Sequence, residues 1–163
     1  MIALATQVGA ALKAQGMMLA TAESCTGGGV ASAVTEIAGS SAWFERGFVT
    51  YANQAKVEML GVAVDTLTRF GAVSEATVRE MVAGALQHSQ AQIALAVSGI
   101  AGPGGGSLEK PVGTVWFAWS IKGEVSVTRL HQLAGSRAEI RAQAVRIALQ
   151  GVLELLDRRT ERV

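Results

Sequence analysis

The 163-residue sequence contains one cysteine and two histidines, and their scarcity excludes two classes of structure. Cys25 is the only cysteine, so an intramolecular disulfide is impossible and a reducing cytoplasm suits the chain. Cysteine and histidine show no metal-ligand spacing, so we expect no metal site. The N-terminal residues lack a positive leader and are interrupted by Gln7 and Lys13, and no later apolar run could span a bilayer. We therefore expect a cytoplasmic protein that begins at Met1 and has no membrane partner.

The sequence also lacks an excess of charge of either sign. Its 14 basic and 13 acidic residues give a formal net charge of +1, and the basic residues are scattered, which disfavours a nucleic-acid partner and favours a small-molecule ligand. Half of the residues are hydrophobic, enough for one domain over 1–163 with its own core. That composition, with Trp43 interpreted as exposed, predicts a homo-oligomer.

The hydrophobic patterns predict helices and strands that alternate early and a hairpin that comes late. Helices are predicted over 2–15, from Gly27 to about 39, over 53–60 with Asn53 as N-cap, over 65–70 and 74–87, and from a capping box at Ser136 and Glu139 to a tail that frays over 157–163. Strands are predicted over 17–22, 44–51, 93–97, 114–121 and 124–133. We therefore predict an α/β fold, a three-layer α/β/α sandwich with a mixed, mostly parallel sheet and a late antiparallel hairpin.

Ser24 lies where the first predicted strand turns into a helix, just before three consecutive glycines. The N–H groups at a helix start have no intrahelical partner and form the positive end of the helix dipole, so they stabilise an anion or a developing oxyanion. Ser24 is therefore a candidate nucleophile. A serine that only caps the helix would show the same local pattern.

A nucleophilic serine needs a base, and the sequence offers two kinds. His88 and His131 fall at a helix end and in an edge-like strand, and the Gly-x-Ser-x-Gly elbow is absent around Ser24. Lys56 falls in the first turn of a helix just after Tyr51, where burial and the dipole would lower its pKa and favour the neutral amine. A core-edge tyrosine and a solvated lysine would give the same spacing.

Other residues have weaker claims to chemistry. Cys25 without a histidine partner is typical of a small buried thiol. Ser107 and Lys110 match the Ser-x-x-Lys spacing but lie in a loop, where they would not share a helix face, so Lys110 is kept only as a possible contact.

Two further features suit an anionic ligand. The glycine-rich run over 98–106 could bring its backbone close to a phosphate, although a flexible surface loop has the same composition. Arg137 and Arg141 are one turn apart at the start of the last helix, where they repel each other and oppose the dipole. An arginine fork on a ligand phosphate would resolve that conflict, and so in part would Glu139 and solvent.

Several of these segments, in this order, resemble the CinA C-terminal family from about Met17 to Arg141. The matching segments are Thr21-Ala-Glu-Ser-Cys-Thr-Gly-Gly28, Gly47-Phe-Val-Thr-Tyr51 with Asn53 and Lys56, Gly71-Ala-Val-Ser-Glu75, Ser98-Gly-Ile-Ala-Gly-Pro103 and Lys110-Pro-Val-Gly-Thr114. Members often carry Gly-Asp-Arg where this chain has Gly135-Ser136-Arg137, which leaves the arginine available and removes the acid.

The resemblance implies a nicotinamide-nucleotide amidohydrolase that works without metal or cofactor. It would hydrolyse the carboxamide of nicotinamide mononucleotide to nicotinate mononucleotide and ammonia, in pyridine nucleotide salvage. It implies Ser24 as nucleophile, with Tyr51 and Lys56 as its activating partners. The residues expected to bind the oxyanion or the substrate are Cys25, Thr26, Gly27, Gly28, Asn53, Ser98, Gly99, Gly102, Arg137 and Arg141. A module that binds or senses a pyridine nucleotide or another phosphorylated metabolite without hydrolysing it is the alternative.

Overall fold

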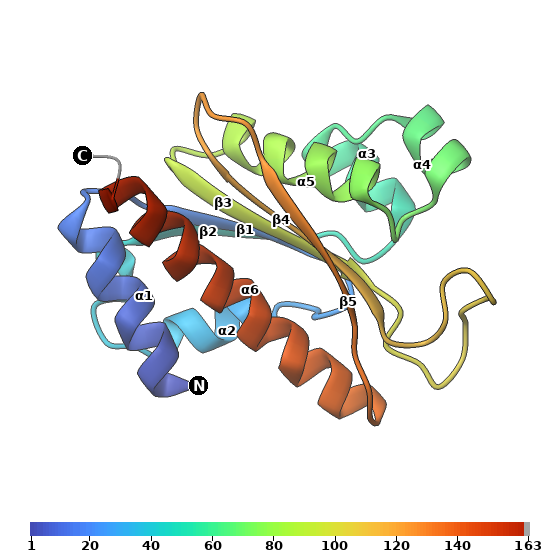
Figure 1. Cartoon of the computed structure of the whole chain (residues 1–163). Helices are drawn as coiled ribbons and strands as arrows, with labels where there is room; N and C mark the ends of the chain where they lie inside the picture. Colours follow the sequence, from blue (N-terminus) through green and yellow to red (C-terminus); the bar gives the residue numbers. More distant parts are fainter. Residues whose placement is uncertain (162–163) are drawn as a thin grey trace.

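A five-stranded mixed sheet forms the middle of the fold in the computed structural model, which describes residues 1–161 (Figure 1). Its strand order is β2-β1-β3-β4-β5, and β1 pairs in parallel with both β2 and β3, whereas β4 is antiparallel to its two neighbours. The elements are α1 (Ile2–Ala14), β1 (Leu19–Glu23), α2 (Gly29–Thr35), the 3₁₀ helix η1 (Ser40–Ala42), β2 (Phe44–Val49), α3 (Asn53–Leu60), α4 (Val64–Phe70), α5 (Glu75–Gln87), β3 (Ile93–Gly99), β4 (Thr114–Ile121), β5 (Val127–Gln132) and α6 (Arg137–Glu161).

Helices cover both faces of this sheet, so the predicted three-layer α/β/α sandwich is confirmed. Figure 1 shows α1, α2 and α6 on one face and α3, α4 and α5 on the other. Each face has its own hydrophobic cluster, one beneath α1, α2 and α6 and the other beneath α3 and α5. The late hairpin of β4 and β5 is also confirmed, with its turn at Lys122 and Gly123.

The two central strands alternate large and small side chains, and this alternation decides what the strand ends present. The large residues face the α6 cluster, and the alanines face the α5 cluster. The large residues are Leu19, Ile93, Leu95 and Val97, and the alanines are Ala20, Ala22, Ala94 and Ala96. Because side chains alternate with a period of two, the next positions on the alanine face are Ser24 and Ser98.

Two tryptophans lie against helical glycines. A Cβ added at Gly9 would lie 2.5 Å from the Trp43 ring, and one added at Gly151 would lie 2.0 Å from the Trp119 ring. Only 2% of Trp43 is exposed, so its interpretation as an exposed residue was wrong. The shape that buries this ring comes from a glycine 34 positions away, which local composition does not reveal. The predicted homo-oligomer loses that support and stays a prediction.

Most helix and strand boundaries agree with the sequence patterns, and the others differ by a few residues. Ala52 is the N-cap of α3, and Asn53 is its first helical residue, so the capping prediction for Asn53 was wrong by one position. The second helix ends at Thr35 rather than near 39. Ser74 is the N-cap of α5, so this helix begins at Glu75, one residue later than predicted. The box of Ser136 with Glu139 caps α6 as predicted.

The first and last predicted strands also shift. Strand β1 begins at Leu19 and includes Glu23, which pairs with residues of both neighbouring strands, and β5 is shorter than predicted. The last helix continues to Glu161, so fraying from 157 was wrong for the residues described. An ion pair of 2.8 Å between Arg159 and Glu124 and hydrogen bonds from Gln15 to the Leu156 carbonyl and the Thr160 hydroxyl hold this tail against the body.

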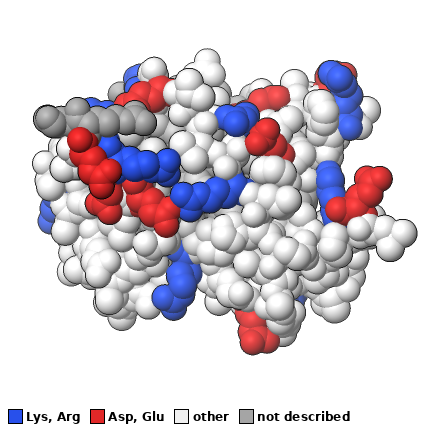
Figure 2. Space-filling view, in the orientation of Figure 1, with Lys and Arg blue, Asp and Glu red and all other residues white. Residues whose placement is uncertain are grey.

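Basic and acidic side chains are interspersed on the face shown in Figure 2. Several basic residues are paired with acids, as in the ion pair of 2.6 Å between Arg129 and Glu154. Within residues 1–161, none of the helices combines the length and the apolar character needed to cross a membrane.

Candidate active site

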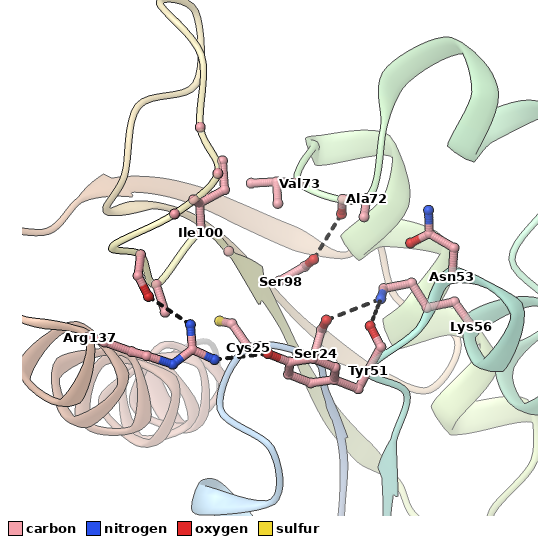
Figure 3. Close-up of a pocket in the computed structure, with 16 residues that line it drawn as sticks. Ser24, Cys25, Tyr51, Asn53, Lys56, Ala72, Val73, Ser98, Ile100 and Arg137 are labelled. Atoms are coloured by element: carbon pink, nitrogen blue, oxygen red, sulfur yellow. Dashed lines mark hydrogen bonds between the residues drawn. The ribbon is translucent and has the colours of Figure 1, made fainter.

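A cavity of about 300 Å³ opens beyond the carboxyl ends of β1 and β3 (Figure 3). Ligands of open α/β sheets commonly bind at this end of parallel strands, and the volume lies at the lower end of the ~300–1,000 Å³ typical of ligand sites. The cavity is lined by Ser24, Cys25, Tyr51, Asn53, Lys56, Ala72, Val73, Ser98, Gly99, Ile100, Ala101, Gly102, Gly104, Gly105, Gly106 and Arg137. Residues predicted from four separate parts of the sequence therefore meet in one place.

Ser24 is held rigidly at the end of β1. Its N–H donates to the Val97 carbonyl at 3.0 Å, which continues the ladder between β1 and β3, and its carbonyl accepts from the N–H of Gly27. The chain then passes through Gly27 and Gly28 with φ of +58° and +99° before α2 begins. Glycine adopts this left-handed conformation without the steric cost that a side chain adds. The tight turn lets Ser24, 8% exposed, reach the cavity.

A buried carboxylate organises the turn from beneath. Glu23 is 1% exposed, and its Oε1 accepts from the Thr26 hydroxyl at 2.6 Å and from the N–H of Val30 at 2.8 Å. Its Oε2 accepts from the N–H of Ala31 at 3.1 Å. These are free N–H groups of the first turn of α2, where a negative charge also interacts favourably with the helix dipole. Glu23 thus fixes the segment that follows Ser24.

Lys56 meets Ser24 from the opposite side of the cavity. Its Nζ lies 3.1 Å from the Ser24 Oγ, 2.9 Å from the Thr50 carbonyl and 3.2 Å from the Tyr51 carbonyl. A neutral amine has two N–H bonds and one lone pair. The two carbonyls can accept the two N–H bonds, which leaves the lone pair to accept the proton of Ser24.

The surroundings of Lys56 favour that neutral form. Lys56 is 1% exposed, and burial lowers the pKa of its ammonium from the ordinary value because the charged form loses its hydration. The nearby Cys25 opposes this shift only as a smaller effect. Among residues 1–161, no carboxylate forms an ion pair with Lys56. A buried amine near a serine hydroxyl, without a counter-ion, is suited to proton transfer.

Tyr51 lines the cavity, and its backbone carbonyl accepts the hydrogen bond from Lys56. The phenolic oxygen of Tyr51 accepts from Arg137 at 2.9 Å, and the side chain is 59% exposed. Arg137 also donates to the Gly102 carbonyl at 2.8 Å. Arg137 therefore joins the Tyr51 side of the cavity to the glycine-rich loop, as Figure 3 shows.

The two predicted arginines are not brought together as a fork. Arg137 lines the cavity, whereas Arg141 donates to the carbonyls of Cys25 at 3.0 Å and Thr26 at 3.2 Å. Its guanidinium thus neutralises carbonyl dipoles of the turn after Ser24. The like-charge conflict inferred from the sequence is relieved because each arginine has its own backbone acceptors.

Cys25 follows Ser24 directly and also lines the cavity. Within residues 1–161 the N–H of Cys25 makes no backbone hydrogen bond, whereas the N–H groups of Gly27 and Gly29 are used within the turn. Of the four predicted donors from Cys25 to Gly28, Cys25 lines the cavity. Burial raises the pKa of its thiol to about 11, partly opposed by the backbone of Cys25 itself and then by Arg141, so the thiol is protonated and a poor nucleophile near neutral pH.

The remaining predicted contacts, Asn53, Ser98, Gly99 and Gly102, also line the cavity. Asn53 lies at the start of α3, and Gly99 and Gly102 begin the glycine-rich loop. A Cβ at Gly99 would lie 2.7 Å from Val115, so this position has no room for a side chain. Ser98 donates from its hydroxyl to the Ala72 carbonyl at 2.9 Å.

The competing candidates are engaged elsewhere. His88 contacts the Gly84 carbonyl at the end of α5, and His131 of β5 packs edge-on against Phe117 of β4. The side chain of Lys110 donates to the Phe70 carbonyl at 2.7 Å, and its backbone N–H donates to the Ser107 hydroxyl in a turn. In the described part of the chain, 1–161, no group of three His, Cys, Asp or Glu side chains could hold a metal ion.

Glu23, Ala72 and Val73 belong to segments that carry the family resemblance, but no role at the site was predicted for them from the sequence. A carboxylate in an otherwise apolar strand, just before a glycine-rich turn, could have drawn attention to Glu23, because a buried acid needs hydrogen-bond donors. Ala72 and Val73 reach the cavity through tertiary packing, and their side chains carry no chemical signal.

Known proteins with similar sequences and structures point to one family. The sequence matches the CinA C-terminal domain over residues 1–156. It is 58% identical over 147 residues to the nicotinamide-nucleotide amidohydrolase PncC of Escherichia coli K12, covering 90% of this chain and 89% of that protein. It is 55% identical to the protein of the same name from Enterobacter agglomerans, with 92% of each covered. The crystal structure of the competence/damage inducible protein CihA from Agrobacterium tumefaciens has a TM-score of 0.92 at 50% identity, covering 96% of this chain and 94% of that one.

Proposed function

Because the chain belongs to the CinA C-terminal domain family, we propose that it hydrolyses the carboxamide of nicotinamide mononucleotide to nicotinate mononucleotide and ammonia. The similarity to amidohydrolases covers nearly the whole of both chains. The observation that carries the proposal is the approach of the Lys56 Nζ to the Ser24 Oγ at 3.1 Å in a cavity of suitable size. The reaction belongs to pyridine nucleotide salvage and takes place in the cytoplasm.

In the first step the Ser24 Oγ attacks the amide carbon while Lys56 takes its proton. The lone pair of Lys56 is directed to Ser24 because the Thr50 and Tyr51 carbonyls hold its two N–H bonds. Lys56 is therefore the direct base, and Tyr51 orients it through its carbonyl. The carbonyl oxygen becomes an oxyanion, for which the N–H of Cys25 is the available backbone donor of the turn.

In the second step the C–N bond breaks, and the ammonium of Lys56 returns its proton to the leaving nitrogen. Ammonia departs, and an ester joins the acyl group to Ser24. Water then attacks the ester while Lys56 takes a proton from it. The C–O bond to Ser24 breaks, and the proton passes to the Ser24 Oγ. One amide and one water thus become one acid and one ammonia, and the enzyme is regenerated.

Arg137 is the group best placed to bind the phosphate of the nucleotide. It lines the cavity at the N-terminus of the 25-residue α6, where the helix dipole adds to its positive charge. Its present acceptors are the Tyr51 hydroxyl and the Gly102 carbonyl, both neutral, and a phosphate would form stronger, charge-assisted bonds.

An ammonia-release assay with nicotinamide mononucleotide, run beside Ser24→Ala, tests the proposal. We expect ammonia from the unaltered protein and none above background from Ser24→Ala, and a quenched reaction should show the acyl group on the peptide that contains Ser24. Unchanged turnover in Ser24→Ala would refute the nucleophile. Thermal stabilisation by the nucleotide without any ammonia would instead favour the sensing module.

A further inference from the structure

Ser98 lies beside Ser24 on the neighbouring strand. Glu23 of β1 pairs with Val97 of β3 in a parallel register, and the Ser24 N–H continues the ladder to the Val97 carbonyl. The next residues along the two strands are therefore opposite each other, at about the 4.7–4.9 Å that separates neighbouring strands. Both continue the alanine face of the sheet, so their side chains point to the same side, as Figure 3 shows.

The proton of the Ser98 hydroxyl is already used in a hydrogen bond within the protein. The hydroxyl donates to the Ala72 carbonyl at 2.9 Å, and Ser98 is only 1% exposed although it lines the cavity. The segment that carries this carbonyl is itself fixed, because the Thr77 and Ser74 hydroxyls both donate to the Gly71 carbonyl. A serine hydroxyl has one proton and two lone pairs. Ser98 can therefore only accept a hydrogen bond from a ligand.

The position of this acceptor matches one part of a bound carboxamide. An amide whose carbon lies at the Ser24 Oγ can turn either its oxygen or its amino group toward Ser98 on the neighbouring strand. Because the Ser98 proton already goes to Ala72, only the amino group can form a hydrogen bond there. A carboxamide brings N–H donors to Ser98. A carboxylate brings only acceptor oxygens, which repel its lone pairs.

We propose that Ser98 accepts a hydrogen bond from the NH₂ group of the scissile carboxamide and so makes the site prefer a primary amide to the carboxylate product. The proposal rests on the proposed function, since it assigns a role within that reaction. Ser98 is then a specificity-determining residue that contacts the substrate and also lowers the affinity of the site for the carboxylate product.

Binding measurements in a Ser24→Ala background, where no turnover interferes, test this role. Calorimetry would give the dissociation constants of nicotinamide mononucleotide, its 3-acetyl analogue, which keeps the carbonyl but has no N–H, and nicotinate mononucleotide. We expect the amide to bind about five- to tenfold more tightly than the acetyl analogue, the effect of one neutral hydrogen bond, with the acid weakest. Adding Ser98→Ala should reduce two affinity ratios to near one, that of the amide to the acetyl analogue and that of the amide to the acid.

Ser120→Ala is the matched control, because Ser120 is a buried serine of β4 outside the cavity, and it should leave the ratios unchanged. If Ser98 only tethers the Ala72 segment, Ser98→Ala will weaken all three ligands equally, and the proposal is refuted. If Ser98→Ala does not fold, the ligand series decides alone, because equal binding of the amide and acetyl compounds also refutes it. Absence of ammonia release by the unaltered protein would overturn the proposed function itself. Ammonia release together with affinity ratios that Ser98→Ala leaves unchanged would overturn only the role of Ser98.

Discussion

Replacing Glu23 by glutamine should destabilise the protein strongly, although the two side chains have nearly the same shape. The Glu23 carboxylate accepts three hydrogen bonds at the start of α2, from the Thr26 hydroxyl and from the N–H groups of Val30 and Ala31. A glutamine that keeps its oxygen toward Thr26 and Val30 must place its NH₂ group against the N–H of Ala31. Two donors then face each other.

The magnitude follows from these contacts. A part-buried N–H without an acceptor costs about 1–3 kcal/mol, and the two remaining hydrogen bonds each lose about 1 kcal/mol when the acceptor is no longer charged. Removing a buried charge returns part of this, because burying a carboxylate is itself unfavourable. We expect a net loss of about 2–4 kcal/mol, a large share of the ~5–15 kcal/mol that keeps a domain folded.

Urea unfolding followed by circular dichroism measures this loss directly. Glu36→Gln is the matched control, because Glu36 is an exposed acid just after the same helix, and it should change the free energy of unfolding by less than about 0.5 kcal/mol. If the free energy of unfolding of Glu23→Gln lies within about 1 kcal/mol of that of the unaltered protein, the three hydrogen bonds do not stabilise the turn to the extent proposed.

Three further predictions concern the base, the thiol and the packing. Lys56→Met should fold and lose about 10²–10⁴-fold in kcat. Since burial lowers the pKa of Lys56 from 10.5, kcat of the unaltered enzyme should rise with pH through that lowered pKa. A flat pH profile together with full activity in Lys56→Met would refute the role of Lys56 as base. Cys25→Ala should keep its turnover, and the native thiol should react with iodoacetamide far more slowly at pH 8 than free cysteine because its pKa is about 11; loss of ammonia release on substitution would contradict this. Gly151→Ala should lower the free energy of unfolding by about 1–3 kcal/mol, despite the higher helix propensity of alanine, because the Cβ would meet Trp119, whereas Gly104→Ala, with open space around it, should be nearly neutral in the same urea experiment.

Local patterns predicted the elements well, because the signals for a helix end, a cap or a hairpin lie within a few residues. The capping box at Ser136 and Glu139 and the hairpin turn at Gly123 are formed as predicted. The boundaries that shifted, as at the end of α6, did so because distant partners such as Glu124 extend an element beyond its own pattern.

The candidate site was predicted in its members and only partly in its arrangement. The sequence named Ser24, Lys56 and Arg137, and the structure places all three at one cavity. Which arginine faces that cavity depended on where the carbonyls of Cys25 and Thr26 point, since Arg141 binds them. A spacing of four residues on a helix cannot contain that information.

The sequence by itself determined the layers of the fold, the turn after Ser24 and the alternation of large residues and alanines, since each depends on neighbours along the chain. Tertiary structure alone decided that Lys56 reaches Ser24 across 32 residues, that Glu23 lies beneath the turn and that the Ser98 hydroxyl donates to the Ala72 carbonyl. The physical reason is that strand register and helix packing set distances between remote residues. A hydrogen bond forms only when those distances agree to within a few tenths of an ångström.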